Sequence, residues 1–267
     1  MLVEKLRQRR LRADELLAFS CPSFHDTPDA PLWHLSVHLK ALSDIADEIA
    51  SFELKLAALY LRMTLYGPVQ RFFLDTFAPS VLISDRHPLI ETLVYLPLYQ
   101  RKIASSTDSF PAARLIRRLL EERVPGAYDA IIAWQAVQSR RLGRNVELCD
   151  VAADLLESFT APAPARMAML QERYRTTLPD VVVMLDVDVS EAMRRSDGRD
   201  ARAELHEEQQ ALTMLREGYE VVLAELPGLH PGIEVHRIAN TGRTIEPTLD
   251  DLLLALRWPA APARAPA

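Results

Sequence analysis

Two kinds of apolar pattern alternate along this chain, and the longer kind predicts helices. Between residues 42 and 66, apolar side chains recur every three or four positions, at Leu42, Ile45, Ile49, Phe52, Leu56, Leu59, Met63 and Tyr66. This spacing places them on one face of a single long helix, where they would form core or a helix–helix seam. Gly67 and Pro68 predict an end or a kink, and a shorter helix follows over Val69–Phe77.

The shorter kind of pattern is a continuous apolar run, which predicts strands. Four such runs occur, at residues 16–21, 81–84, 181–185 and 233–238, and the first is closed by Pro22. Runs without polar alternation are typical of strands covered on both faces, as in a parallel sheet between helices. The sequence therefore predicts an α/β fold with three layers, α/β/α, around a mostly parallel sheet.

The remaining segments complete one predicted domain over residues 1–257. Residues 100–178 are expected to form a helical insert. A helix whose apolar face runs from Leu205 to Leu226 should end at Pro227 and Gly228, and a closing helix is expected over Leu249–Leu256. Residues 258–267 contain mostly proline and alanine and are expected to be a disordered tail.

Composition and charge narrow the class of protein. The chain has 267 residues, of which 49% are hydrophobic and 25% charged, as in an ordinary globular protein. No apolar run approaches the roughly 20 residues that a membrane-spanning helix needs, and no signal core follows the basic N-terminus. Two cysteines cannot build a disulfide framework. A net charge of −6 disfavours nucleic acid as a partner. We therefore expect a cytoplasmic protein with neither membrane nor nucleic-acid partners.

Polar residues that follow two of the strands are the first candidates for chemistry. Asp85 and Arg86 come directly after residues 81–84, while Asp186 and Asp188 close the run at 181–185. Ligands of parallel α/β sheets bind at the carboxyl ends of strands. An Asp-Arg pair is also common as a surface ion pair, and Asp188 is as well explained as a helix cap with Glu191 three residues on.

A second candidate is the pair His34 and His38. These two residues have the i, i+4 spacing of metal ligands on a helix, yet no third ligand stands near them in the sequence. A solvated or core pair is the better interpretation.

Several segments, taken in order, resemble the thymidylate kinase family of P-loop nucleotide kinases. Residues 81–87 are similar to that family's strand followed by Asp-Arg-His, and residues 178–187 to its Pro-Asp strand that ends in Leu-Asp-Val. Arginines at 194, 195, 199 and 202, followed by residues 215–219, resemble its lid and the next helix. Arg62 stands at about the position of a substrate-binding arginine. Cys21 and Pro22 fall where an Arg-Glu-Pro loop ends, but the Arg-Glu is missing.

The resemblance implies ATP- and Mg²⁺-dependent phosphoryl transfer to a nucleoside monophosphate. Arg62 and Arg86 would fork onto the acceptor phosphate, because guanidinium matches phosphate geometry, and Tyr66 and Tyr95 would offer an aromatic surface to the base. Asp85 would hold Mg²⁺ or orient the acceptor. The resemblance further implies that Arg194, Arg199 and Arg202 close over the donor phosphates, and that Asn240 and Thr241 contact ATP.

The phosphate loop of that family is absent. A G-x-x-x-x-G-K-[ST] motif would cradle the donor phosphates, and none of the eight glycines fits it. Residues 2–7 resemble the helix that follows the loop. This pattern indicates a longer chain with a strand and loop upstream, so that the chain as written is an inactive truncated kinase. The loss of a central strand would leave buried edges unpaired, at about 1–3 kcal/mol per group, which favours truncation.

Two further functions are compatible with the same sequence. The chain is alternatively a catalytically dead kinase-like module for binding or oligomerisation, or a kinase of another small acceptor. The apolar stripe over residues 42–66 would serve a homodimer as well as an internal core.

Overall fold

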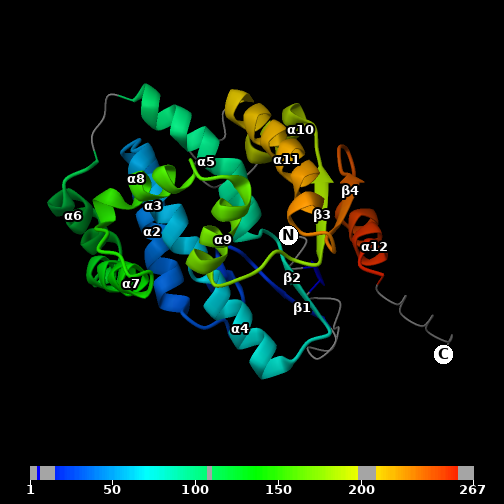
Figure 1. Cartoon of the computed structure of the whole chain (residues 1–267), viewed down its shortest axis with the longest axis horizontal. Coiled ribbons are helices and arrows are strands. Elements are labelled where there is room, and N and C mark those ends of the chain that lie inside the picture. The colour runs from blue at the N-terminus through cyan, green and yellow to red at the C-terminus, as the bar shows by residue number, and fades with distance from the viewer. Residues whose placement is uncertain (1–4, 7–15, 107–109, 198–208, 258–267) are drawn as a thin grey trace.

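A computed structural model describes residues 5–6, 16–106, 110–197 and 209–257 (Figure 1). Its α-helices are α2 (Trp33–Glu48), α3 (Phe52–Met63), α4 (Tyr66–Phe77), α5 (Pro88–Ser105), α6 (Ala113–Arg123), α7 (Ala127–Arg141), α8 (Val151–Ser158), α9 (Ala163–Tyr174), α10 (Val189–Asp197), α11 (Gln209–Leu229) and α12 (Ile245–Ala255). Short 3-10 helices are η1 (Phe24–Asp26) and η2 (Leu148–Asp150), and the strands are β1 (Leu16–Phe19), β2 (Val81–Ser84), β3 (Val181–Asp186) and β4 (Glu234–Ala239).

The four strands form two separate pairs. Strand β1 lies parallel to β2, with Leu16 opposite Val81, and β3 lies parallel to β4, with Val181 opposite Glu234. Among the described residues no hydrogen bonds join one pair to the other. The expected strands are thus present, and both pairs are parallel.

The expected three-layer α/β/α fold with a mostly parallel sheet is wrong. The structure is 66% helical and has only these two short two-stranded sheets among the described residues. Apolar strand runs indicated a sheet buried on both faces, but every residue of β2 and β3 is only half-buried. Helices supply most of the fully buried side chains instead, including Leu42, Leu61 and Leu96.

The single long helix expected over residues 42–66 is also wrong, because the chain reverses direction after Glu48. Ala50 adopts a left-handed conformation with φ of 53°, and the Ser51 hydroxyl then caps α3 by accepting a hydrogen bond from the Leu54 N–H at 3.3 Å. A serine cap begins a new helix. Helices α2 and α3 therefore pack against each other, and the apolar stripe is their shared seam.

Other predicted helix boundaries differ from the observed ones by a few residues. Gly67 and Pro68 lie in the first turn of α4 rather than at the end of a helix, where the missing N–H of Pro68 costs nothing. Pro227 and Gly228 lie within the last turn of α11, which ends at Leu229. Residues 249–256 mostly belong to α12, which already begins at Ile245.

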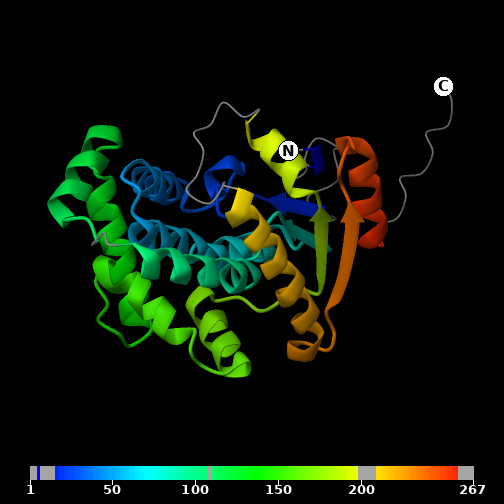
Figure 2. The ribbon, with the colours of Figure 1, turned by 90° about the horizontal axis from the view of Figure 1, so that it is seen from above.

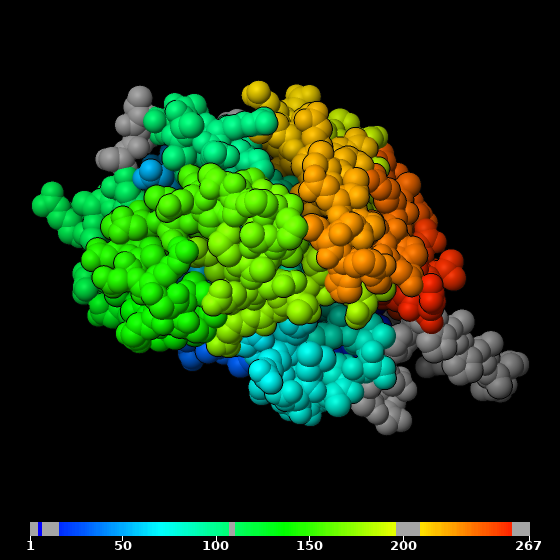
Figure 3. All heavy atoms as spheres, in the orientation of Figure 1, coloured from blue at the N-terminus to red at the C-terminus, as the bar shows by residue number. Residues whose placement is uncertain are grey.

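The helices and the strand pairs occupy different parts of the molecule. In both Figure 1 and Figure 2, α2, α6 and α7 lie toward one end, while β3, β4 and α12 lie toward the other, with α12 outermost. The space-filling view shows that helical segments, α9 in yellow-green and α11 in orange, form much of one face (Figure 3). Within the described ranges, no helix combines the length and apolar character needed to cross a membrane.

Candidate functional site

A cavity of about 290 Å³ opens where the ends of β1 and β2 meet helices α3 and α5. Its walls come from segments far apart in the sequence. These lining residues are Ser20, Cys21, Pro22, Ser23, Asp26, Lys40, Leu56, Leu59, Tyr60, Arg62, Met63, Asp85, Arg86, Glu91, Thr92, Tyr95, Leu96, Tyr99, Leu155 and Tyr174. We refer to this cavity as the central pocket.

The strand ends are joined at the mouth of the central pocket. Strand β1 is followed by Cys21 and a cis peptide bond to Pro22, and the Cys21 N–H donates a 2.6 Å hydrogen bond to Oδ1 of Asp85 after β2. Asp85 is exposed to solvent, yet the protein atoms crowded around its carboxyl raise its pKa above the usual value. The parallel pairing of β1 with β2 thus brings the Cys21 turn and the Asp85–Arg86 segment to one edge.

A buried guanidinium stands on the opposite wall. Arg62, in the last turn of α3, is only 5% exposed, and its Nη2 donates a 3.1 Å hydrogen bond to the Ser23 hydroxyl. Charged side chains are rarely buried without a role in pairing or binding. Lys40 of α2 adds a second cation to the pocket and is paired with Asp44 one turn along α2.

Glu91 and Arg86 form the polar centre of the wall that α5 contributes. Glu91 is 6% exposed, and its Oε1 accepts a short hydrogen bond from the Tyr219 hydroxyl of α11. Arg86 Nη1 lies 3.6 Å from Glu91 Oε2, and its side chain remains about half-exposed. Burial raises the pKa of the Glu91 carboxyl, while the nearby Arg86 charge and the Tyr219 hydroxyl act in the opposite direction.

The rest of the lining is largely aromatic and apolar. Tyr60, Tyr99 and Tyr174 are buried, and Tyr95 is half-buried. The Tyr174 hydroxyl lies 2.7 Å from the Thr92 hydroxyl, which fastens α9 to α5. Such rings offer flat apolar surface to a planar ligand while their hydroxyls keep polar partners.

Four of the sequence-predicted site residues therefore line the central pocket, namely Arg62, Asp85, Arg86 and Tyr95. Tyr66 does not. It is buried behind the strand ends, where its ring lies 5.3 Å from Phe19 and 4.9 Å from His87 between centroids. Burial lowers the pKa of His87 to about 3, so this histidine is neutral and acts as core.

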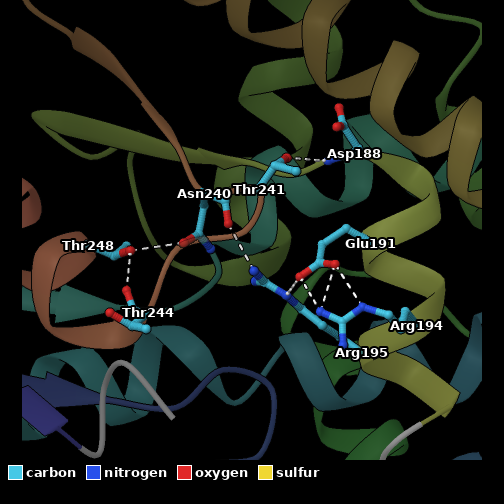
Figure 4. Close-up of polar contacts among 8 residues, drawn as sticks. All are labelled: Asp188, Glu191, Arg194, Arg195, Asn240, Thr241, Thr244 and Thr248. Carbon is cyan, nitrogen blue, oxygen red and sulfur yellow. Dashed lines mark hydrogen bonds and ion pairs between the residues drawn. The ribbon is translucent and has the colours of Figure 1, made fainter.

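Arg194 and Arg195, expected in a phosphate-binding lid, lie elsewhere and are held by a carboxylate. Figure 4 shows both guanidinium groups directed at Glu191 on the same helix, α10, at 2.8 Å. Arg195 also donates a 2.9 Å hydrogen bond to the backbone oxygen of Asn240. Arg199 and Arg202 lie outside the described residues.

The two residues expected to contact ATP make internal contacts. The Asn240 side-chain oxygen accepts a 2.9 Å hydrogen bond from the Thr248 hydroxyl, and the Thr241 hydroxyl accepts one of 2.9 Å from the Asp188 N–H (Figure 4). These bonds connect β4 to α12 and to the start of α10. Neither residue lines the central pocket.

Asp85 is the residue expected to hold Mg²⁺. Among the described residues no group of three or more His, Cys, Asp or Glu side chains is arranged to hold a metal ion, and His34 and His38 are no exception. Asp85 as a magnesium ligand and ATP as a cofactor stay predictions.

Sequence reasoning missed Glu91 and the tyrosines at 60, 99 and 174. Glu91 left a signal, because it is a lone acid among apolar residues in the first turn after Asp85–Arg86. The tyrosines fit the apolar stripes of their helices, so only the packing of α3, α5 and α9 distinguishes them from core.

No family model matches the chain, and neither the curated proteins nor the solved structures gave a match.

Proposed function

We propose that the central pocket is the acceptor site of a phosphotransferase that resembles nucleotide kinases, and that it binds a nucleoside-type acceptor, free or as its monophosphate. One observation carries this proposal. Arg62, Asp85, Arg86 and Tyr95 come from three separate segments and all line one cavity.

The charges of the pocket support a polar ligand with a compact charged or hydroxylated end. Arg62 and Lys40 stand on the α2–α3 side, and Arg86 stands beside Asp85 and Glu91 on the other. Buried guanidinium groups are well suited to oxygen-rich ligands, since they present several donors in a fixed plane. A ligand with oxygen atoms can accept further hydrogen bonds from these groups, which a purely apolar ligand cannot do.

The tyrosine-lined part of the pocket supports a planar group. Tyr60, Tyr95 and Tyr99 lie on two helices that pack against each other, α3 and α5. Aromatic side chains bind planar rings through offset stacking or edge contacts, at about 0.5–1.5 kcal/mol beyond area burial. A nucleobase joined to a sugar hydroxyl or phosphate combines both requirements in one molecule.

The test is calorimetric titration of the folded protein with common nucleosides and their 5′-monophosphates. We expect selective binding of at least one base. Because a charge-assisted hydrogen bond contributes about 1.5–3 kcal/mol, Arg86→Ala should weaken that binding about tenfold or more.

Arg71→Ala is the matched control. Arg71 lies on α4, is 83% exposed, pairs with Asp75, and does not line the pocket. It should leave affinity unchanged. Absence of binding by the folded protein, or equal affinity in the wild type and Arg86→Ala, would contradict the proposal.

A further inference from the structure

Glu91 lines the central pocket, and the protein hydrogen-bonds only one of its two carboxylate oxygens. One carboxylate oxygen, Oε1, accepts the hydrogen bond from Tyr219. The other, Oε2, is buried and has no hydrogen-bond partner among the described residues. A buried acceptor without a partner is destabilising, so folded proteins rarely keep one without a reason.

The nearest cation is too far from Oε2 for a hydrogen bond. Arg86 Nη1 lies 3.6 Å from Glu91 Oε2, which is an ion pair but exceeds the usual 2.7–3.2 Å of an N–H···O hydrogen bond. Arg86 and Glu91 both line the pocket, so a donor and an acceptor lie side by side at its wall. A group that accepts from one and donates to the other satisfies both.

An alcohol is such a group. A hydroxyl donates one hydrogen bond and accepts others through the same oxygen. An amino group of a nucleobase donates well but accepts poorly, and a phosphate dianion only accepts. A hydroxyl therefore suits the position beside Arg86 and Glu91 better than an amino group or a phosphate does.

We propose that Glu91 Oε2 accepts a hydrogen bond from a hydroxyl of the acceptor while Arg86 donates to the same oxygen, so that the pocket selects a free alcohol over its phosphate ester. This inference rests on the proposed function and names the acceptor's reacting group. Glu91 is then a specificity-determining residue.

Charge repulsion supports the same selection. Glu91 and Asp85 both border the position beside Arg86, so a phosphate dianion placed there meets two carboxylates and one guanidinium. Like charges in a partly desolvated site repel strongly. A neutral hydroxyl avoids this repulsion and retains the contact with Arg86.

The test compares three forms of one compound by calorimetric titration. The nucleoside whose base binds best is titrated beside its 5′-monophosphate and its 5′-deoxy analogue. We expect the nucleoside to bind about tenfold more tightly than either, since one charge-assisted hydrogen bond is worth at least a decade of affinity.

Glu91→Gln then assigns the preference to this carboxylate. The amide keeps the size of the side chain and removes its negative charge, so the monophosphate should bind more tightly and the nucleoside less tightly than in the wild type. Glu122→Gln is the control, because Glu122 on α6 is 66% exposed and does not line the pocket.

The outcomes are distinguishable. A monophosphate that binds the wild type more tightly than the nucleoside, or a Glu91→Gln protein with unchanged preference, overturns this inference and leaves the proposed function standing. Failure of every compound to bind overturns the proposed function itself. The wild-type comparison needs no variant, so it decides the matter even if Glu91→Gln does not fold.

Discussion

The Tyr219 hydroxyl on α11 donates a hydrogen bond to Oε1 of Glu91 on α5, across 128 positions of the sequence. The bond lies at the contact of these two helices, where Glu91 is buried and Tyr219 is half-buried. It holds the Glu91 carboxyl in one orientation at the pocket wall. Folding therefore places an ionisable group in surroundings that oppose its ionisation.

The stability of the protein should depend on pH through Glu91. Burial raises the folded-state pKa of its carboxyl above the ordinary value of 4.5. Between the ordinary and the raised pKa, the folded state binds more protons than the unfolded state, so the free energy of unfolding decreases as pH rises through this range. Glu91→Gln should flatten that dependence.

The pH dependence of stability is measured by thermal unfolding, followed by circular dichroism, from about pH 4 to about pH 8. Asp85, whose pKa is also raised, should leave a residual slope of the same sign in the variant. Identical slopes for the wild type and Glu91→Gln would show that Glu91 carries no part of the effect.

Replacing Lys55 should strongly destabilise the fold. Its ammonium lies 2.5 Å from Oδ2 of Asp47, with 1% and 7% of the two side chains exposed. Lys55→Met leaves the Asp47 charge buried without this ion pair, at an expected cost of about 3–5 kcal/mol.

Chemical denaturation measures this cost, with Arg71→Met as the matched variant. That change breaks the exposed Arg71–Asp75 pair and should cost less than about 1 kcal/mol. Similar losses in both proteins would mean that burial does not strengthen the Lys55 pair.

Gly67 should not tolerate a methyl group. A Cβ atom at this position would lie 2.4 Å from the backbone oxygen of Tyr174 and 2.7 Å from that of Arg175. Gly67→Ala must therefore move α4 away from the end of α9, and overpacking of this kind costs about 1–3 kcal/mol or more.

Gly228→Ala tests the same chemical change in open space, since nothing lies within 4 Å of a Cβ built there. The two variants should shift the melting temperature in opposite directions, because alanine favours a helix by up to about 1 kcal/mol over glycine. Unchanged stability of Gly67→Ala would contradict the close approach of α4 and α9.

The 267-residue chain should show negligible phosphoryl transfer even if its pocket binds an acceptor. Its sequence has no G-x-x-x-x-G-K-[ST] motif to hold donor phosphates. A coupled ATP assay with the best-binding nucleoside and its monophosphate measures this. Turnover of about 1–100 s⁻¹, as in ordinary kinases, would contradict the prediction.

Local patterns predicted strands well and their assembly poorly. All four apolar runs form strands within one or two residues of their expected bounds. Whether strands join into one sheet depends on contacts across the fold. A run such as Val181–Leu185 has the same composition in a larger parallel sheet as in the two-stranded pair that it forms with β4.

For the helices too, the sequence predicted the apolar positions better than the arrangement of the elements. Most positions in the stripe from Leu42 to Tyr66 are buried, although Ile49, Phe52 and Leu59 are half-buried. The periodicity gave no sign that the chain reverses direction, because the apolar spacing continues from one helix into the next. Ser51 was the available signal, as a serine three residues before Leu54 is a typical cap. Charged pocket residues such as Arg62 and Arg86 were predicted because their segments resemble those of a nucleotide kinase family. Tyr60, Tyr99 and Tyr174 gave no comparable signal.

The reversal at Ala50 and Ser51 determines which side of α3 faces the central pocket. Each residue of an α-helix turns the chain by about 100° around the axis. A single residue inserted within the first turn of α3 would therefore rotate Tyr60 and Arg62 by more than a quarter of a circle relative to the cap. The number of residues between Ser51 and Arg62 therefore determines whether Tyr60 and Arg62 point into the pocket or away from it.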